Sequence, residues 1–339
     1  MARQTDRSRS GTPHKTSRKA TAVASPSVSE LSDLDRALIE ILRLDGREGN
    51  RALASQLNVN EVTVAAHLRR LEEADLVRIV AVTDIRLFGH RELVFATFRV
   101  AGRSVRDVAA EVAELPEAIG VTICSGRFDI IAPMLCRDRQ HISEMFGNQL
   151  PSIAGVGSLR GALSLDVLKF DSKWAMFADP GATPEAQPSD TVDETDLAII
   201  NLLQHNARRS NRSIAAELGV SEGTVRGRIK QMLAERVFRI QAVSNVAAFG
   251  FGAHAYLAIK TVAGRIDEVA AALAERDDVP ELSRVLGEFD FLAILIAAHH
   301  DALISAVVDE IALLADVERV EISYGCDSIK HNYAWTWIV

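Results

Sequence analysis

Two short turns carry residue types that could bind a small charged molecule. Both have the pattern Gly-x-Phe-Asp, at residues 126–129 and again at residues 287–290. Glycine exposes backbone amides that can donate to a carboxylate, aspartate can accept from an ammonium group, and phenylalanine could wall an apolar side chain, which together suits an α-amino acid. The same residues also suit a plain hairpin turn, because glycine permits a positive φ and aspartate bonds its own backbone. The candidate residues are Gly126, Phe128, Asp129, Gly287, Phe289 and Asp290.

No catalytic constellation is evident in the sequence. Its nine histidines are scattered, His299 and His300 are best explained as the start of a helix, and there is no Gly-rich phosphate loop or His-x-x-x-His pair. The cysteines Cys124, Cys136 and Cys326 lie far apart, which argues against a disulfide framework or a Cys-rich zinc site. We therefore expect neither an enzyme nor a cofactor, and a protein of the reducing cytoplasm.

Composition and charge narrow the class further. Apolar residues make up 48% of the 339 positions, which is enough for a sizeable core. The chain has no apolar run of about 18 residues and no apolar secretory signal, so we expect no membrane contact. The net charge is −8, so binding to nucleic acid must depend on a local basic surface.

An internal repeat organises the chain. Residues 35–39 resemble residues 196–200, a separation of 161 (196 − 35), and the same separation relates the two Gly-x-Phe-Asp turns. Between residues 31 and 90, 19 of 60 positions are identical to the residue 161 places later, without a gap. The chain therefore contains two fused copies of one unit, residues 31–178 (copy one) and 192–339 (copy two).

The first third of each copy has the pattern of a helix-turn-helix. Apolar residues from Leu34 onward recur at helical spacing, and two shorter helical stretches follow, separated by residues 58–60. Asn58 suits the left-handed conformation that ends a helix, and Asn60 can cap the next one. Gly219 and Ser221 are their counterparts in copy two. Alone, this pattern also fits an ordinary three-helix cluster with a solvated charged face.

Local charge favours nucleic-acid binding, above all in copy two. Residues 207–241 contain eight Lys/Arg and three acids, a net charge of +5 (8 − 3), whereas residues 46–80 contain five of each. A local basic surface is what phosphate binding requires, so the second helix-turn-helix should bind DNA more tightly. The expected DNA contacts lie on the last helix of each motif: Asn60, Thr63, His67, Arg69 and Arg70, then Ser221, Thr224, Arg226, Arg228 and Lys230.

The other two thirds of each copy predict an α+β domain. Strand patterns at 93–100, 121–125, 130–136 and 156–168 alternate with helical patterns at 104–115 and 138–150, and copy two runs in the same order. The order βαββαβ indicates a ferredoxin-like layer of two helices on one antiparallel sheet, whose other face needs a partner. The second copy is the obvious candidate for that partner.

These patterns divide the chain into six parts. Residues 1–30 contain ten Ser/Thr, six Lys/Arg and two acids, which predicts a disordered basic tail. Residues 179–191 contain three prolines and predict a linker. The expected division is tail 1–30, helix-turn-helix 31–82, βαββαβ domain 88–178, linker 179–191, helix-turn-helix 192–243 and βαββαβ domain 249–339.

The combined motifs resemble the leucine-responsive regulatory protein/AsnC (Lrp/AsnC, feast/famine) regulators, present here twice in tandem. In that family a winged helix-turn-helix is followed by a βαββαβ domain, as expected here. The resemblance covers residues 31–178 and 192–339. The residues that carry it are Asp35, Ile39, Leu42, Asn50, Arg51, Ala54, Leu57, Val59, Glu61, Val62, Thr63 and Val64, with Asp196, Asn211, Arg212, Leu218, Gly219, Val220, Ser221, Thr224 and Val225, and both Gly-x-Phe-Asp turns.

This resemblance implies a sequence-specific DNA-binding transcriptional regulator whose βαββαβ domains pair sheet to sheet and bind small effectors. The family's effector pocket forms near the Gly-x-Phe-Asp hairpin, so these residues become expected ligand contacts. Ser221 and Arg228 keep the family's recognition-helix pattern, whereas Asn60 and His67 depart from it. The implied partners are double-stranded DNA with an imperfect palindrome, an amino acid or related metabolite, and further copies that associate around an internal pseudo-dimer.

A second class shares this architecture. The chain also resembles the siroheme decarboxylases, which can be fused in tandem and carry a His/Tyr/Arg-rich segment at the first strand of the βαββαβ domain. Here that place holds His90 and Arg91 in copy one, and His254 and Tyr256 in copy two. A lone histidine is too little for a tetrapyrrole site, so the regulator is the favoured interpretation and the decarboxylase the alternative.

Overall fold

Each copy begins with three helices that end where the local sequence predicts. The computed structural model describes residues 31–74, 76–84, 89, 91–170, 192–235, 237–244, 252–331 and 335–337, so the predicted tail and linker lie outside the described residues. The helices of copy one are α1 (Asp33–Leu44), α2 (Asn50–Leu57) and α3 (Glu61–Glu73), and those of copy two are α6 (Glu194–His205), α7 (Asn211–Leu218) and α8 (Glu222–Ala234).

The turn between the second and third helix has the predicted chemistry. Asn58 and Gly219 adopt left-handed conformations, with φ of 53° and 69°, and end α2 and α7. Asn60 and Ser221 then cap α3 and α8, because their side chains accept from the backbone amides of the third residue along. Both helix-turn-helix predictions are confirmed at this local level.

The two helix-turn-helix units form one intertwined body. The strands that follow them, β1 (Val77–Asp84) and β6 (Phe238–Ser244), pair antiparallel with each other, and Val80 lies opposite Gln241, its own counterpart. A pseudo-two-fold axis therefore passes through this pair. Helix α1 packs on β6 and α6 on β1, and one continuous apolar core contains residues of both copies. Neither unit has a separate core, so burial of apolar surface holds them in a single arrangement.

Two βαββαβ domains form the rest of the molecule. Copy one contributes β2 (Glu92–Val100), α4 (Val105–Glu114), β3 (Gly120–Gly126), β4 (Ile130–Cys136), α5 (Arg139–Glu144) and β5 (Val156–Phe170). Copy two contributes β7 (Ala253–Thr261), α9 (Ile266–Ala274), β8 (Glu281–Leu286), β9 (Phe291–Ala297), α10 (His300–Ser305) and β10 (Val317–His331). Short π- and 3₁₀-turns, 145–152 and 306–313, continue α5 and α10. His299 caps α10, as predicted.

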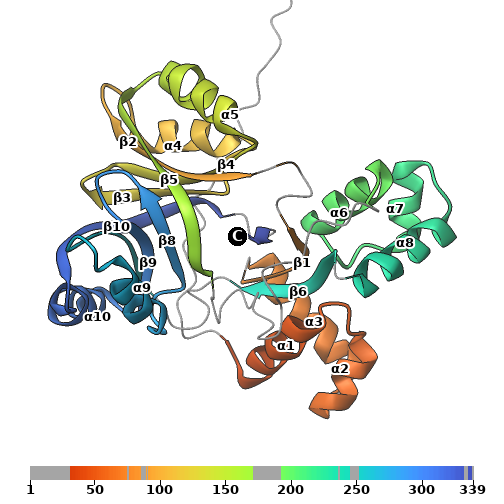
Figure 1. Cartoon of the computed structure of the whole chain (residues 1–339). Coiled ribbons are helices and arrows are strands. Elements are labelled where there is room, and N and C mark those ends of the chain that lie inside the picture. The colour runs from red at the N-terminus through yellow and green to blue at the C-terminus, as the bar shows by residue number, and fades with distance from the viewer. Residues whose placement is uncertain are drawn as a thin grey trace, which may run out of the picture.

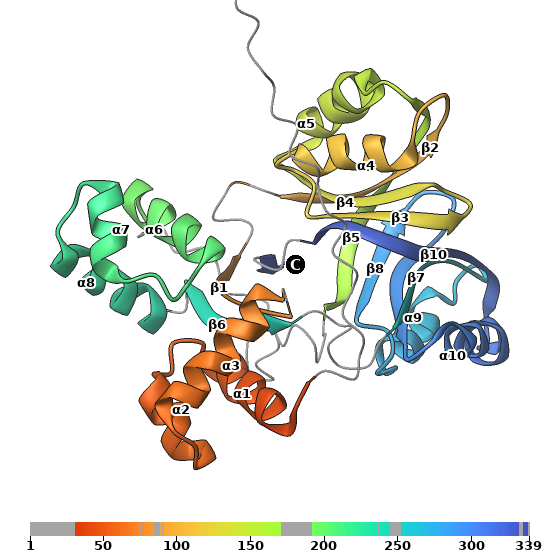
Figure 2. The same ribbon diagram turned by 180° about the vertical axis from the view of Figure 1, so that it is seen from behind.

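The two sheets close into one barrel with the strand order β10-β3-β4-β2-β5-β8-β9-β7. The long last strand of each domain crosses to the other copy, so that β5 pairs with β8 and β10 with β3. The sheets thus face each other across an interior, while α4 with α5 and α9 with α10 cover opposite outer sides (Figures 1 and 2). The α+β fold of two tandem units is confirmed, and copy two covers the sheet face of copy one.

One further strand links the barrel to the helix-turn-helix body. The short strand β11 (Trp335–Trp337), which the sequence did not predict, follows β10 closely and pairs parallel with the end of β1. The strand β11, which follows the last barrel strand, is therefore hydrogen-bonded to the two-stranded ribbon between the helix-turn-helix units. Among the described residues, no helix combines the length and apolar character needed to cross a bilayer.

Candidate functional site

Four of the predicted DNA contacts form the starts of the recognition helices α3 and α8. The side-chain oxygen of Asn60 accepts from the amide (2.7 Å) and the hydroxyl (2.9 Å) of Thr63. Ser221 Oγ accepts from the Thr224 amide at 3.0 Å. These side chains lie at the end of the helix that enters the major groove in helix-turn-helix proteins. Arg69, Arg226 and Lys230 are exposed beside them.

Two predicted contacts of copy one are tied to a buried carboxylate. His67 Nδ1 lies 2.8 Å from Asp35 Oδ1, and the Arg70 guanidinium donates to Asp35 Oδ2. The Asp35 side chain is fully buried, and it also forms the capping box of α1 with Ser32. Burial alone would raise the pKa of Asp35, but hydrogen bonds from Ser32, His67 and Arg70 outweigh it and lower the pKa to about 2.

In copy two, a different side chain of the third helix contacts the equivalent buried aspartate of the first helix. Arg228, the counterpart of His67, lies 3.0 Å from Asp196 and 2.7 Å from Asp193, the cap of α6. Hydrogen bonds to Asp196 and Asp193 raise the pKa of Arg228. Arg228 thus orients α8 against α6. Sequence reasoning missed this role, although the repeat had singled out Asp35 and Asp196.

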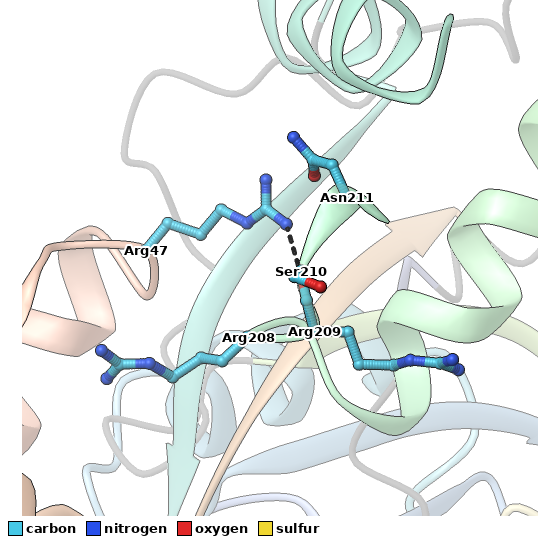
Figure 3. Close-up of a pocket in the computed structure, with 5 residues that line it drawn as sticks. All are labelled: Arg47, Arg208, Arg209, Ser210 and Asn211. Carbon is cyan, nitrogen blue, oxygen red and sulfur yellow. Dashed lines mark hydrogen bonds between the residues drawn. The ribbon is translucent and has the colours of Figure 1, made fainter. Parts of the chain in front are cut away.

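A basic pocket of about 330 Å³ lies where the two helix-turn-helix units meet, lined by Arg47, Arg208, Arg209, Ser210 and Asn211. Arg47 extends from copy one toward Ser210 and Asn211 of copy two, while Arg208 and Arg209 point away from each other (Figure 3). Arg47 donates to the carbonyls of Ala207 (3.2 Å) and Arg209 (3.5 Å).

Arg208 is the counterpart of Arg47 (208 − 161 = 47) and reaches the opposite way, to Asn50 of copy one at 2.7 Å. Arg209 instead pairs at 2.5 Å with Glu217 of its own copy. Burial lowers the pKa of Arg47. Since Arg47 and Arg208 both bond across the copies, they brace the two units against each other, a role that sequence reasoning did not identify.

The aspartates of both Gly-x-Phe-Asp turns are bonded within their own domain. Asp129 accepts from the Val100 amide at 2.7 Å and from Arg99 at 3.0 Å. Asp290 accepts from the equivalent amide, that of Thr261, at 2.8 Å and from Lys260 at 2.9 Å. Burial would raise the pKa of Asp290, but the bonds from Thr261 and Lys260 lower it. Both carboxylates thus hold the hairpin to the end of the neighbouring strand.

The two hairpins meet at one end of the barrel. Arg127 reaches Glu288 of the other hairpin at 2.5 Å, and its guanidinium lies 5.4 Å from the ring centres of both Phe128 and Phe289. A cavity of about 30 Å³ beneath them is lined by side chains that include Phe95, Phe128 and Tyr256. This volume is far below the roughly 300 Å³ at which ordinary ligand pockets begin.

Comparisons with known proteins agree with this geometry. A model described as a winged helix-turn-helix DNA-binding domain matches residues 31–78, and one described as an AsnC-type helix-turn-helix domain matches residues 192–233. The model of the Lrp/AsnC ligand binding domain matches twice, at residues 93–174 and 254–335.

Two archaeal relatives align with a single unit of this chain. The HTH-type transcriptional regulator Ptr1 of Methanocaldococcus jannaschii is 32% identical over 133 residues, which are 39% of this chain and 90% of that protein. The HTH-type transcriptional regulator FL11 of Pyrococcus abyssi is 30% identical over 129 residues, 38% of this chain and 85% of that protein. This chain belongs to the Lrp/AsnC family, and it is a transcriptional regulator with DNA-binding helix-turn-helix domains in duplicate.

A solved structure shares the tandem architecture. The siroheme decarboxylase NirDL superposes with a TM-score of 0.61 over 88% of this chain and 93% of its own, at 15% sequence identity. This likeness concerns the fold. In the present chain, Tyr256 lies inside the barrel and bonds Thr122 at 3.2 Å, whereas the equivalent position in copy one is Phe95.

Proposed function

We propose that this regulator binds an imperfect palindromic operator with both recognition helices, and that an amino acid or related metabolite changes its DNA affinity. The observation that carries the proposal is the pseudo-two-fold pairing of β1 with β6, which holds two unlike recognition helices in one body. In helix-turn-helix dimers, the operator mirrors the symmetry of the protein. Unlike helices therefore require unlike half-sites.

The proposed DNA contacts differ between the copies in local charge. Each recognition helix has exposed cations, Arg69 on α3 and Arg226 with Lys230 on α8, and each has a side chain held by a buried acid, Asp35 or Asp196. The segment around α8 carries a charge of +5, whereas the segment around α3 is neutral. Because phosphate contacts dominate DNA affinity, copy two supplies most of the binding free energy.

The proposed effector site lies where the hairpins meet. Phe128 lines the small cavity there, and the Gly-x-Phe-Asp carboxylates stand at the same end of the barrel. Asp129 and Asp290 already accept two or more bonds each, but a carboxylate has about four acceptor positions, so an ammonium group can share them. The cavity is far smaller than an ordinary ligand pocket, so we infer that the hairpins separate when the ligand binds.

Such an opening offers a route to the DNA-binding body. The hairpins are continuous with β3, β4, β8 and β9, and β3 pairs with β10. Strand β10 leads to β11, which is bonded to β1 between the two helix-turn-helix units. A ligand that binds only the open hairpins thus favours one arrangement of β10 and β11 over another, and differential affinity of this kind is what couples two sites.

Thermal-shift screening of the twenty amino acids tests the effector proposal, with an Asp129→Ala/Asp290→Ala variant as the control. A stabilising amino acid that also changes operator affinity in fluorescence anisotropy is expected. Equal binding by the double variant would place the effector site elsewhere. The operator itself comes from a genome-wide DNA pull-down with the full chain, whose neighbouring genes indicate the metabolite.

The tandem fold shared with NirDL makes a decarboxylase the second candidate. We infer a regulator in preference, since its curated relatives are transcriptional regulators and the first barrel strand of copy one carries Leu93 and Phe95 where copy two carries His254 and Tyr256. Purified protein should show no tetrapyrrole absorption band and should bind DNA. A bound tetrapyrrole without DNA binding would reverse this preference.

A further inference from the structure

The contact between the hairpins joins two residues that occupy the same position in the two copies. Arg127 and Glu288 are 161 positions apart (288 − 127), and Arg127 Nη2 lies 2.5 Å from Glu288 Oε2. A residue that meets its own counterpart must lie on the pseudo-two-fold axis. In a symmetric pair of identical domains, this contact would bring together two like charges.

A second pair of equivalent positions has the same inversion of charge. Arg160 of β5 and Glu321 of β10 are also 161 positions apart (321 − 160). Arg127 reaches Glu321 at 2.5 Å, and Arg160 reaches Glu288 at 3.5 Å. Copy one therefore contributes only arginines at these positions and copy two only glutamates.

One arginine of copy two partly offsets its two glutamates. Arg319 lies 3.1 Å from Glu288 and 3.5 Å from Glu321, so copy two contributes a net negative charge smaller than two at this place. Hydrogen bonds to Glu288 and Glu321 raise the pKa of Arg127, and that from Arg127 lowers the pKa of Glu288. Arg127 and Glu288 thus both hold their charge at neutral pH.

The apolar contacts between the sheets do not distinguish the copies in this way. Phe95 corresponds to Tyr256, and Ile131 corresponds to Leu292, and all four line the cavity beneath the hairpins. Side chains of similar size would pack equally well if copy one met another copy one. Apart from the hydrogen bond between Tyr256 and Thr122, charge complementarity is what separates the alternatives, because like charges in contact disfavour the wrong partner.

We propose that Arg127 and Arg160 with Glu288 and Glu321 form a pairing code, by which an effector domain of copy one accepts only an effector domain of copy two. The partner is the other half of the same chain or the complementary half of a second copy. Pairing of copy one with copy one brings four arginines together, and pairing of copy two with copy two brings together four glutamates and only the two Arg319 side chains. The duplicated chain thereby avoids symmetric exchange with like domains.

Full-length charge-reversal variants test this code. Arg127→Glu/Arg160→Glu makes both copies acidic at the interface, and Glu288→Arg/Glu321→Arg makes both basic. Each variant should unfold a few degrees below the unaltered protein at low ionic strength, and the difference should shrink in about 1 M salt, where the Debye length is about 3 Å. The fourfold swap, which carries all four substitutions, should regain the original midpoint.

Mixing separates a pairing code from ordinary stabilisation. When the acidic and basic variants are unfolded and refolded together, cross-chain pairing restores complementarity, so the midpoint should rise above that of either variant and a differently tagged chain should be co-purified. The matched control, Arg137→Glu/Arg139→Glu, changes the net charge equally at exposed residues of copy one and should behave like the unaltered protein in both assays. Unchanged midpoints in the reversal variants, or no recovery on mixing, would overturn the proposal.

Discussion

The guanidinium of Arg228 lies 3.0 Å from the carboxylate of Asp196, and at the equivalent place in copy one His67 lies 2.8 Å from Asp35. The buried aspartate is the same in both copies, but its partner is histidine in copy one and arginine in copy two. The same two side chains are proposed DNA contacts. If they bind DNA, substitution of either one changes DNA affinity and the orientation of its helix together.

The first prediction compares recognition-helix substitutions. Arg228→Ala and Lys230→Ala should weaken operator binding more than His67→Ala and Arg70→Ala, by about 1–3 kcal/mol for each lost contact, because copy two carries the local positive charge. Fluorescence anisotropy over a series of salt concentrations measures this, and loss of a phosphate contact lowers the salt slope by about 1. Lys230→Ala should leave thermal stability unchanged, whereas Arg228→Ala should lower it. Equal losses of affinity from both copies would contradict the asymmetry.

The second prediction concerns acid stability. The pKa of Asp35 is depressed to about 2 in the folded protein, so its ionised form stabilises the fold above the pKa of an unfolded aspartate. This contribution should decline from about pH 4 and be lost as the pH falls through about 2. Asp35→Asn should lower the free energy of unfolding by about 1–3 kcal/mol at pH 7, because His67 and Arg70 lose their charged acceptor. The stability of the variant should also change less between pH 2 and pH 4. Urea unfolding between pH 2 and pH 7 checks both statements.

The third prediction tests the brace between the helix-turn-helix units. Arg47→Ala removes bonds to two carbonyls of copy two and should destabilise the protein by about 1–2 kcal/mol. Arg208→Ala, which loses the bond to Asn50, should cost about 1 kcal/mol. Arg209→Ala is the matched control, since its exposed ion pair with Glu217 lies within copy two and should contribute about 0–1 kcal/mol. A loss from Arg209→Ala as large as that from Arg47→Ala in urea unfolding would argue against the brace.

The fourth prediction concerns a buried acid inside the barrel. Burial raises the pKa of Glu281 to about 8; Ser283 donates to one of its oxygens, and Oε2 has no hydrogen-bond partner among the described residues. A raised pKa means that the folded protein holds the proton longer, so stability should fall as the pH rises from about 4.5 to about 8. Glu281→Gln cannot ionise. The stability of this variant should therefore not decline over this pH range, and its free energy of unfolding at pH 8 should exceed that of the unaltered protein by about 1–3 kcal/mol. A decline of equal slope in the variant would contradict the assignment to Glu281.

Local chemistry was predictable from the sequence because it depends on neighbouring residues. The capping residues Asn60 and Ser221 and the left-handed positions Asn58 and Gly219 act over a few residues of chain, and the structure has them as predicted. The duplication follows from the constant separation of 161 residues, and the order of helices and strands follows from periodicity. The family was indicated by the resemblance of the combined motifs to the Lrp/AsnC regulators. Each of these is a one-dimensional property.

Only the tertiary structure decided which of these residues meet. The cross-copy pairing of β1 with β6, the crossing of β5 and β10 to the other sheet, and the strand β11 bring together segments that are far apart in sequence. In the sequence, Arg127 and Glu288 are only the unspecified second residues of the two Gly-x-Phe-Asp turns. In the structure they lie 2.5 Å apart, at the pseudo-two-fold axis. The sequence determined what each unit is, because propensity and capping are local. The tertiary structure decided which charged residues of the two units form ion pairs, because burial and ion pairing depend on distance in space.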